Sequence, residues 1–320
     1  MANTLYVKTP LIEAFNINGK YTAYLKLENT QPSGSFKTRG ISFHCQKLKE
    51  RGCHCLVSSS GGNAGLAVAY TGRKLGLPVT VFVPETTNDH VIQKLNQQGA
   101  SVIKKGAVWD ITNEYALRFV GEKKEDCAAL VHPFNHAEIW KGHSTIIHEL
   151  KEQMKAPPDA VVLSVGGGGL LCGVAEGLKH VGWSDVPIIA CETEGADCFN
   201  AAISAGKIIA LSEITSVAKS LGALTVAEEA FRWYSQRKII SVKLSDKDAV
   251  SACLRFSEDH KMLVEPACGA SLAVLYKEDI LTELVDTKQL RKLESIVVIV
   301  CGGHSVNIEQ LVKWKQEFDI

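Results

Sequence analysis

Short β-branched segments alternate with helical segments along most of the chain, and this alternation constrains the fold more than any other feature of the sequence. A first series of such units lies between residues 55 and 132, and a second series lies between residues 160 and 300. The connections within each series are short, which is typical of βα units. The sequence therefore predicts an α/β fold of two doubly wound lobes, with parallel strands and a ligand-binding cleft at the carboxyl ends of the strands.

The periodicity also gives approximate bounds for the elements. We expect strands at 56–58, 78–83, 101–104, 129–132, 160–165, 187–191, 239–244 and 295–300, and helices at 88–98, 110–123, 170–180 and 197–205. Another helix ends at Leu75, and one more begins at Ser245, whose spacing to Asp248 predicts a capping box. The Pro-rich break at 156–158 separates the two series.

Composition excludes several classes of protein. The 35 Lys and Arg residues balance 35 Asp and Glu residues, which argues against nucleic acid or an anionic membrane as the main partner. The 46% of hydrophobic residues exclude a disordered chain. The first residues lack the pattern of a signal peptide, and the longest apolar segments are far shorter than a membrane span. We therefore expect a cytoplasmic protein.

The chain has ten cysteines, which we expect to be free thiols because the cytoplasm is reducing. The segment Cys53-His54-Cys55 is the nearest approach to a zinc cluster. It has no second pair at ligand spacing, so ordinary packing is favoured over a metal site.

Four consecutive glycines, Gly166 to Gly169, stand between a predicted strand and a predicted helix. Backbone N–H groups at a helix N-terminus, with no side chains in the way, suit a bound phosphate. The run does not fit the dinucleotide fingerprint, and no Walker A loop is found. A site for a single phosphate is favoured over the alternative of a flexible turn.

Two other loops carry groups that bind ligands. Residues 31–40 place Lys37 in a loop of small residues that opens a helix, although an exposed lysine alone is usually a solvated charge. Residues 58–65 concentrate hydroxyl and N–H groups, which suit a carboxylate, a phenolate oxygen or a phosphate. By itself the second loop is equally typical of an ordinary N-capped turn.

Taken together, five segments resemble the fold-type II pyridoxal-phosphate enzymes, the tryptophan synthase β-subunit group. They are PSGSFKTRG at 32–40, SSSGGNAG at 58–65, SVGGGGLLCGV at 164–174, VEPACGA at 264–270 and VIVCGG at 298–303. These segments are most similar to the L-serine dehydratase / L-threonine deaminase branch, and within it to the serine dehydratase-like proteins. The resemblance implies pyridoxal 5'-phosphate in the cleft, a small domain at 31–134 inserted into a large domain formed by 1–30 and 135–320, and a homodimer.

The resemblance also implies roles for single residues. Lys37 would hold the cofactor as a Schiff base and act with Ser60 in catalysis. The other implied cofactor contacts are Phe36 against the ring, Asn63 at the ring 3-oxygen, Gly166, Gly167, Gly168, Gly169 and Leu170 at the phosphate, and Cys301 at the pyridine nitrogen. The implied substrate contacts are Ser59, Ser60, Gly61, Gly62 and Asn63. A monovalent cation, potassium, would lie among Gly166, Glu192, Ala196, Leu221 and Ala223, of which only Glu192 is an obvious cation ligand from the sequence.

The implied reaction is α,β-elimination from L-serine or L-threonine, giving pyruvate or 2-oxobutanoate plus ammonia, with a place in amino-acid metabolism and gluconeogenesis. A thiol at Cys301 is a poor stabiliser of a pyridinium, which favours elimination over transamination. Gly61 stands where efficient dehydratases have Ala, so we expect a looser loop and slower turnover, and no racemisation. The alternatives are a β-replacement enzyme of the cysteine synthase type and a cofactor-binding protein with weak or no turnover.

Two further expectations concern selectivity and control. Residues around Phe134 and Ala223 are candidates for setting the preference between serine and threonine. No appended regulatory domain is recognised, so feedback control of the kind seen in longer threonine deaminases is not expected.

Overall fold

The computed structural model describes residues 4–15, 17, 21–123, 127–291 and 293–320. It contains two compact units. The first combines the described residues up to Val7 with Gln31–His143, and the second combines Lys8–Thr30 with Ser144–Ile320. These units are defined by how closely their residues pack. The domain boundary at residue 134 stays a prediction.

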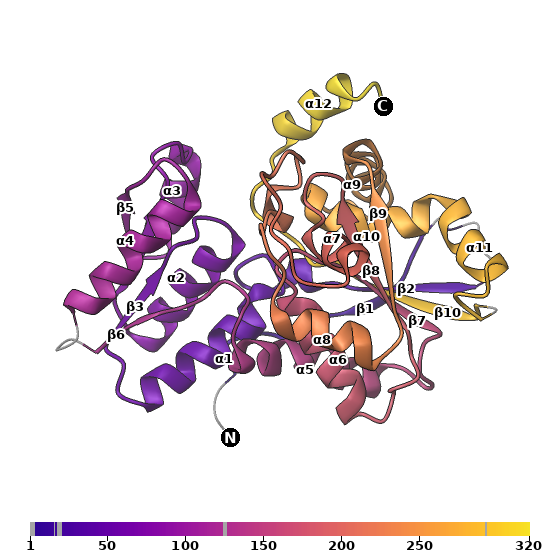
Figure 1. The fold of residues 1–320 in the computed structure, drawn as a ribbon, viewed down its shortest axis with the longest axis horizontal. Helices are drawn as coiled ribbons and strands as arrows, with labels where there is room; N and C mark the ends of the chain where they lie inside the picture. The colour runs from indigo at the N-terminus through magenta and orange to yellow at the C-terminus, as the bar shows by residue number, and fades with distance from the viewer. Residues whose placement is uncertain (1–3, 16, 18–20, 124–126, 292) are drawn as a thin grey trace. The chain divides into compact units, whose positions relative to one another are not determined.

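The first unit is built on a parallel sheet of four strands, in the order β5-β4-β3-β6 (Figure 1). The strands are β3 (Cys55–Ser58), β4 (Val79–Val83), β5 (Ser101–Lys104) and β6 (Ala128–Leu130). The helices are α1 (Lys37–Glu50), α2 (Asn63–Leu75), α3 (Asp89–Gln97) and α4 (Trp109–Glu122). Neighbouring strand residues face opposite ways: Leu56 packs in one apolar cluster with residues of α1, α2 and α3, while Val57 packs with Ala116 of α4. Helices therefore cover both faces of the sheet.

The second unit contains a six-stranded sheet in the order β1-β2-β10-β7-β8-β9. Its strands are β1 (Leu11–Glu13), β2 (Thr22–Lys26), β7 (Ala160–Ser164), β8 (Ile188–Thr193), β9 (Ile239–Leu244) and β10 (Ser295–Ile299). All neighbouring pairs are parallel except β1 with β2. The helices are α6 (Gly169–His180), α7 (Cys198–Ala205), α8 (Glu228–Gln236), α9 (Asp246–His260), α10 (Pro266–Tyr276), α11 (Glu278–Asp286) and α12 (Ile308–Glu317). Two 3-10 turns, η1 (Glu28–Thr30) and η2 (Lys219–Leu221), belong to the same unit. Helix α5 (Ala137–Gln153) has residues in both units.

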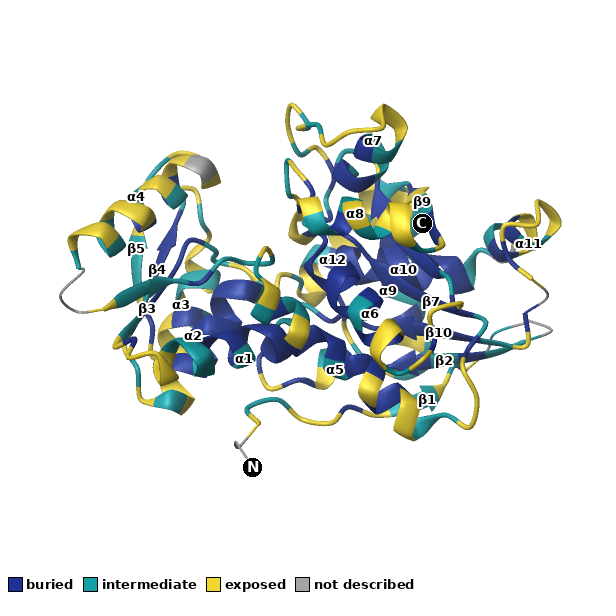
Figure 2. Cartoon of the chain, turned by 60° about the horizontal axis from the view of Figure 1, so that its bottom comes forward, coloured by how far each residue is buried: buried dark blue, intermediate teal, exposed yellow. Residues whose placement is uncertain are grey.

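The predicted parallel α/β architecture is confirmed, and so is the capping box. The Ser245 hydroxyl accepts from the Asp248 N–H, and the Asp248 carboxylate accepts from the Ser245 N–H. The sequence did not predict the antiparallel strand β1, which at three residues is too short to show a period. It also missed α10, because Pro266–Leu275 is buried on every side (Figure 2) and a helix without a polar face has no amphipathic pattern. No helix in the described part of the chain combines the length and apolar character that crossing a membrane requires.

A buried ion pair joins the second strand of the large sheet to α5. The Lys26 ammonium is fully buried and lies 2.6 Å from a carboxylate oxygen of Glu149. The same ammonium donates to the Thr9 carbonyl at 2.8 Å and to the Gln153 amide oxygen at 2.9 Å. The buried ammonium is thus hydrogen-bonded to these three acceptors, one of them charged, and such partners are the condition under which a buried charge is tolerated.

We expect Glu149→Gln to destabilise the protein by about 3 kcal/mol, because it removes the carboxylate charge that lies 2.6 Å from the buried Lys26 ammonium. The double variant Lys26→Met/Glu149→Leu removes both charges and is expected to lose less stability than Glu149→Gln alone. Urea unfolding measures the free energies. A double variant that is less stable than the single one would contradict this account of the pair.

Candidate active site

Phe36 and Lys37 lie at the start of α1, as the loop motif predicted. The Lys37 Nζ donates to the Pro133 carbonyl at 2.6 Å and lies 5.1 Å from the centroid of the Phe36 ring. The Phe36 ring in turn lies 4.9 Å from the ring of His143. A Cβ on Gly40, one turn further along α1, would come within 2.5 Å of the Ile139 carbonyl oxygen. Glycine at position 40 therefore lets α1 approach α5 closely enough to fix the start of the helix.

Two neutral histidines stand beside Lys37, and the sequence analysis did not single out either of them. His132 Nδ1 accepts from the N–H groups of Phe134 and Asn135, at 3.2 and 2.8 Å. Burial and the Lys37 charge lower the pKa of His132 to about 4. His143 is fully buried, neither of its ring nitrogens has a hydrogen-bond partner, and burial lowers its pKa well below the ordinary value. The surroundings of the Lys37 amine thus carry no second positive charge from these rings.

The loop at 58–65 lies between β3 and α2. Its shape depends on Gly65, because a Cβ there would lie 1.7 Å from the Ser60 carbonyl oxygen. The Ser59 hydroxyl donates to the Asn113 amide oxygen of α4 at 2.8 Å, and the Ser60 N–H donates to the Ser58 hydroxyl at 3.3 Å. Asn113, absent from every motif, therefore orients the hydroxyl of a predicted substrate contact.

Gly61 corrects an expectation from the sequence. A Cβ at this position would lie 2.9 Å from Val83 Cγ1, 3.4 Å from Val91 Cγ1 and 3.8 Å from Thr87 Cγ2. The space that an alanine methyl would use is therefore filled by apolar side chains of the same unit. The missing methyl therefore leaves no gap beside Gly61, contrary to the reason given for a looser loop, whereas slower turnover stays a prediction.

The glycine run follows β7 and leads into α6. Gly168 has φ of +89°, and a Cβ there would lie 2.5 Å from Ala230 Cβ; a Cβ on Gly166 would lie 3.0 Å from Leu221 Cα. No side chain caps the first turn of α6, which begins at Gly169. The first N–H groups of a helix have no acceptor within the helix, so those of Gly169 and Leu170 suit an anion.

Glu192, at the carboxyl end of β8, is fully buried. Its two carboxylate oxygens accept from the N–H groups of Phe199 and Asn200, at 2.8 and 2.7 Å, in the first turn of α7. Burial raises the pKa of Glu192 to about 8. This carboxylate is bound by neutral dipoles, and no lysine or arginine in the described chain forms an ion pair with it.

The other residues expected around a cation lie in the same unit. Ala196 N donates to the Thr193 carbonyl at 2.9 Å, and Ala223 N donates to the Leu221 carbonyl at 2.7 Å. The Gly166 carbonyl accepts from the Cys198 thiol at 3.5 Å. Gly166 therefore lies against Leu221. The roles of Gly166, Glu192, Ala196, Leu221 and Ala223 as cation ligands stay a prediction.

Cys301 follows β10 and is 6% exposed. A hydrogen bond with Cys268 and burial raise the pKa of the Cys301 thiol well above its ordinary value, so the thiol is neutral. Cys268 comes from α10, in the VEPACGA segment.

All ten cysteines are free, and the thiol of Cys53 donates to the Cys55 carbonyl at 3.2 Å. The interpretation of Cys53-His54-Cys55 as ordinary packing agrees with this contact.

Comparison with known proteins decides the family. The sequence profile of the family described as "Pyridoxal-phosphate dependent enzyme" matches residues 2–302. The chain belongs to this family. A Homo sapiens relative named "Serine dehydratase-like" is 50% identical over 308 residues, which are 96% of this chain and 93% of the relative. A Bos taurus relative named "L-serine dehydratase/L-threonine deaminase" is 48% identical over 316 residues, which are 98% of this chain and 96% of the relative.

A solved structure agrees with this assignment. The chain is similar to a fungal L-serine ammonia-lyase from Rhizomucor miehei with a TM-score of 0.91 and 36% identity, and the likeness covers 99% of this chain and 100% of that one. The expected fold type is therefore confirmed.

The residues of this pyridoxal-phosphate dependent enzyme fit its cofactor. The uncapped first turn of α6 offers N–H groups to a phosphate, and Lys37 offers a primary amine beside an aromatic ring. Cys301 offers a neutral thiol at the carboxyl edge of the large sheet. Each group, taken within its own unit, has the chemistry that one part of the cofactor requires: a phosphate, an aldehyde or a ring nitrogen.

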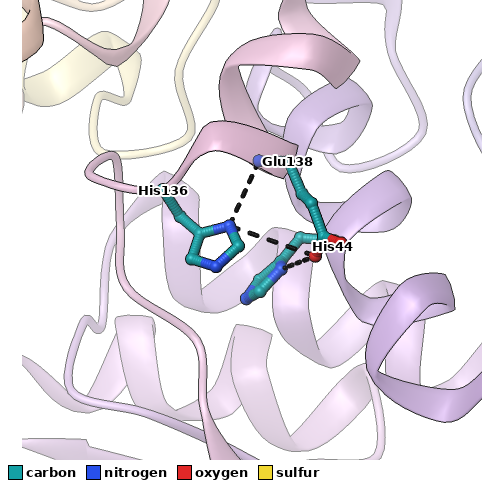
Figure 3. Close-up of side chains that lie close together, drawn as sticks. All are labelled: His44, His136 and Glu138. Atoms are coloured by element: carbon teal, nitrogen blue, oxygen red, sulfur yellow. Dashed lines mark hydrogen bonds and ion pairs between the residues drawn. The ribbon is translucent and has the colours of Figure 1, made fainter. Parts of the chain in front are cut away.

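A separate polar cluster in the first unit was also missed by the sequence analysis (Figure 3). Within the described residues, His44, His136 and Glu138 form a group whose ligand atoms all lie within 4.8 Å of one another, close enough to hold a metal ion. His44 Nδ1 lies 2.8 Å from Glu138 Oε2, and the Arg51 guanidinium donates to both Glu138 oxygens at 2.8 and 2.9 Å. His136 Nδ1 accepts from the Glu138 N–H at 3.1 Å. Because Arg51 occupies the carboxylate, this cluster is an ion-pair network that ties α1 to the start of α5.

This network predicts a pH dependence of stability. Hydrogen bonds from Arg51 lower the pKa of Glu138 to about 2, against 4.5 for the unperturbed group. A depressed pKa stabilises the fold above the unfolded pKa, and this contribution is lost as the pH falls from about 4.5 towards 2. Urea unfolding in that range should therefore show a steeper loss of stability for the wild type than for Glu138→Gln. The control is Glu50→Gln, which removes an exposed carboxylate paired with Lys47; equal slopes for all three proteins would contradict the prediction.

The packing around Gly61 predicts coupling to Val83. We expect Gly61→Ala to destabilise the protein by about 1–3 kcal/mol, because the new methyl overlaps Val83 Cγ1. The double variant Gly61→Ala/Val83→Ala should be more stable than the sum of the two single effects predicts, by about 0.5–3 kcal/mol. Free energies of unfolding in urea give the cycle, and strict additivity would show that the two side chains do not compete for this space.

Proposed function

We propose that this chain is a pyridoxal-phosphate-dependent L-serine/L-threonine dehydratase, an ammonia-lyase that forms pyruvate or 2-oxobutanoate plus ammonia by α,β-elimination. The observation that carries the proposal is the nearly full-length identity to a relative named "L-serine dehydratase/L-threonine deaminase". The likeness to a solved L-serine ammonia-lyase supports it independently.

Lys37 is the proposed base. Bound pyridoxal phosphate supplies an electron-withdrawing ring that makes the α-proton of an amino acid acidic. The Lys37 Nζ takes up this proton, and the absence of a second positive charge on His132 and His143 favours an amine that can be deprotonated. In the fold the Lys37 side chain is directed by the Pro133 carbonyl, which accepts its hydrogen bond.

The remaining roles divide between two loops. Ser59, Ser60, Gly61 and Gly62 hold the substrate carboxylate through hydroxyl and N–H groups, and Asn63 binds the ring oxygen of the cofactor. Gly166 to Gly169 and Leu170 hold the phosphate. Asn113 is a positioning residue for this arrangement, because it accepts the Ser59 hydrogen bond and so sets the direction of that hydroxyl.

The state of Cys301 supports elimination over transamination. Its thiol is neutral and accepts or donates only a weak hydrogen bond, so it provides no charge to keep a pyridine nitrogen protonated. The electron pair left on the α-carbon then forms the Cα–Cβ double bond as the β-hydroxyl leaves, and the hydroxide together with the proton taken up by Lys37 makes one water.

We also propose a potassium ion beside Glu192. A fully buried carboxylate held by two N–H groups, with no ion-pair partner among the described residues, gains stability from an added cation. Gly166, Ala196, Leu221 and Ala223 would supply backbone oxygens, which are the ligands that hard cations prefer.

Three finer proposals follow from resemblance. The enzyme would act as a homodimer in the cytoplasm, in amino-acid metabolism and gluconeogenesis. Residues near Phe134 and Ala223 would set the preference between serine and threonine. The domain bounds of 31–134 for the small domain, with 1–30 and 135–320 as the large one, remain part of this proposal.

The decisive variant is Lys37→Ala. Purified wild type should show a visible absorbance band from its cofactor and form keto acid from serine or threonine. The variant should lose the band and about 10²–10⁴-fold of the turnover, because both depend on the same amine. Lys47→Ala, on the exposed side of the same helix, is the control. A wild-type protein that binds the cofactor but yields no keto acid with either substrate refutes the proposal, and a product that appears only with added sulfide indicates β-replacement.

The cation is tested by thermal stability, which does not depend on turnover. The raised pKa of Glu192 means that stability falls as the pH rises from about 4.5 to about 8, since the folded state holds this proton more tightly. Replacing choline by potassium should therefore raise the melting temperature more at pH 8 than at pH 6, and Glu192→Gln should remove this response. Glu194→Gln, an exposed neighbour, is the control. Equal potassium responses of wild type and Glu192→Gln would exclude Glu192 as a ligand.

A further inference from the structure

A hollow of about 690 Å³ lies in the second unit, at the amino ends of the parallel strands. Its walls come from the connections that lead into β7, β8, β9 and β10 and from the end of α8. The lining residues are Pro158, Asp159, Lys179, Ser184, Asp185, Val186, Pro187, Trp233, Gln236, Arg237, Lys238, Gln289, Leu290 and Arg291. Gly166 and Cys301 follow the opposite, carboxyl ends of β7 and β10, and Glu192 lies at the carboxyl end of β8. The hollow is therefore a separate place from the candidate active site, and its size suits a small ligand.

The charges of the hollow are unbalanced. Four cationic side chains line it, from Lys179, Arg237, Lys238 and Arg291, against two carboxylates. One of these, Asp159, already accepts from the N–H groups of Glu294 and Ser295, at 2.7 and 2.8 Å. None of the four cations forms an ion pair with a carboxylate of the described chain. A surface cation without a partner is ordinary, but four around one concavity concentrate a positive potential.

Arg237 is the most constrained of the four. Its guanidinium donates to the carbonyls of Ala175, Ser184 and Val186, which hold it in one orientation. Its Nε is buried and has no hydrogen-bond partner. The guanidinium is therefore held in place by neutral carbonyls, and no carboxylate of the described chain pairs with it, so its positive charge adds to the attraction of the hollow for an anion.

The apolar part of the lining adds a second element of recognition. Trp233 is half-buried, and the Lys179 ammonium lies 6.0 Å from the centroid of its ring. Val186, Pro187 and Leu290 extend the apolar wall. A ligand with charged groups at one end and a carbon skeleton at the other would use both surfaces.

We propose that this hollow is a binding site for a small polyanion with at least two negative charges, carried by phosphate or carboxylate groups, and that it is distinct from the cofactor site. Lys238 at the entrance to β9 and Lys179 at the end of α6 bind the anionic groups, and the fixed charge of Arg237 adds to the attraction. The proposal does not depend on the reaction that the enzyme catalyses.

The test uses the full chain with its cofactor bound. Pyrophosphate and citrate, as probes of phosphate and carboxylate chemistry, are titrated at constant ionic strength and followed by calorimetry and tryptophan fluorescence. We expect saturable binding of one or both probes with Kd of about 1 mM or below. Binding of pyrophosphate alone identifies phosphate as the preferred group, and binding of citrate alone identifies carboxylate. The fluorescence change should disappear in Trp233→Phe while the calorimetric binding persists.

Matched charge variants locate the site. Lys179→Gln/Lys238→Gln removes two exposed cations of the hollow and should weaken binding by about tenfold or more. Lys313→Gln/Lys315→Gln removes two lysines of α12 outside the hollow and should leave Kd within about twofold of the wild type. The proposal is overturned if neither probe saturates below about 10 mM, or if both double variants bind as the wild type does. Because the cofactor absorbance and keto-acid assay are measured on the same samples, failure here is distinct from failure of the proposed dehydratase activity.

Discussion

The parallel pairing of β10 between β2 and β7 is the constraint on which the second unit depends. Residues Ile296 to Val298 pair with 160–162 on one side and with 23–25 on the other. This strand comes from the last part of the chain and is inserted between strands from its first and middle parts. Because parallel strands end at the same edge, the pairing brings Cys301, which follows β10, to the edge where Gly166 follows β7 and where β8 ends with Glu192 and Thr193. The proposed cofactor contacts Gly166 and Cys301 thus owe their common edge to this ladder.

Close backbone approach imposes a second constraint, which glycine meets. Gly166 lies against Leu221 and Gly168 against Ala230, so the glycine run is required by packing on η2 and α8 as well as by any phosphate. Gly303 is equally restricted, because its φ is +129° and a Cβ there would overlap the Glu265 carboxylate. The glycines near the proposed cofactor site thus allow close packing and also leave backbone N–H groups open to a phosphate. A larger residue at these positions would disturb both the packing and the proposed phosphate site.

Buried charge is handled in three different ways in this chain. Lys26 has a carboxylate partner and two neutral acceptors, whereas Glu192 has two N–H donors and a raised pKa. Arg237 has three carbonyls and one unused donor. The Lys26 charge is thus neutralised by a carboxylate of the protein itself. Glu192 and Arg237 are held by neutral backbone groups, with no ion-pair partner among the described residues.

Local sequence patterns determined most of the secondary structure, the capping box at Ser245, the loops that flank the strands and the family. These features depend on residues within a few positions of one another, and periods of two and 3.6 are read within a single segment. Tertiary structure alone decided that His132 and His143 stand beside Lys37, that Asn113 orients Ser59, and that Gly61 faces Val83. It also decided the lining of the hollow, which gathers four connections spread between residues 158 and 291. Contacts of this kind join residues that are far apart in the chain, so no local pattern records them, and only the packed fold brings them together.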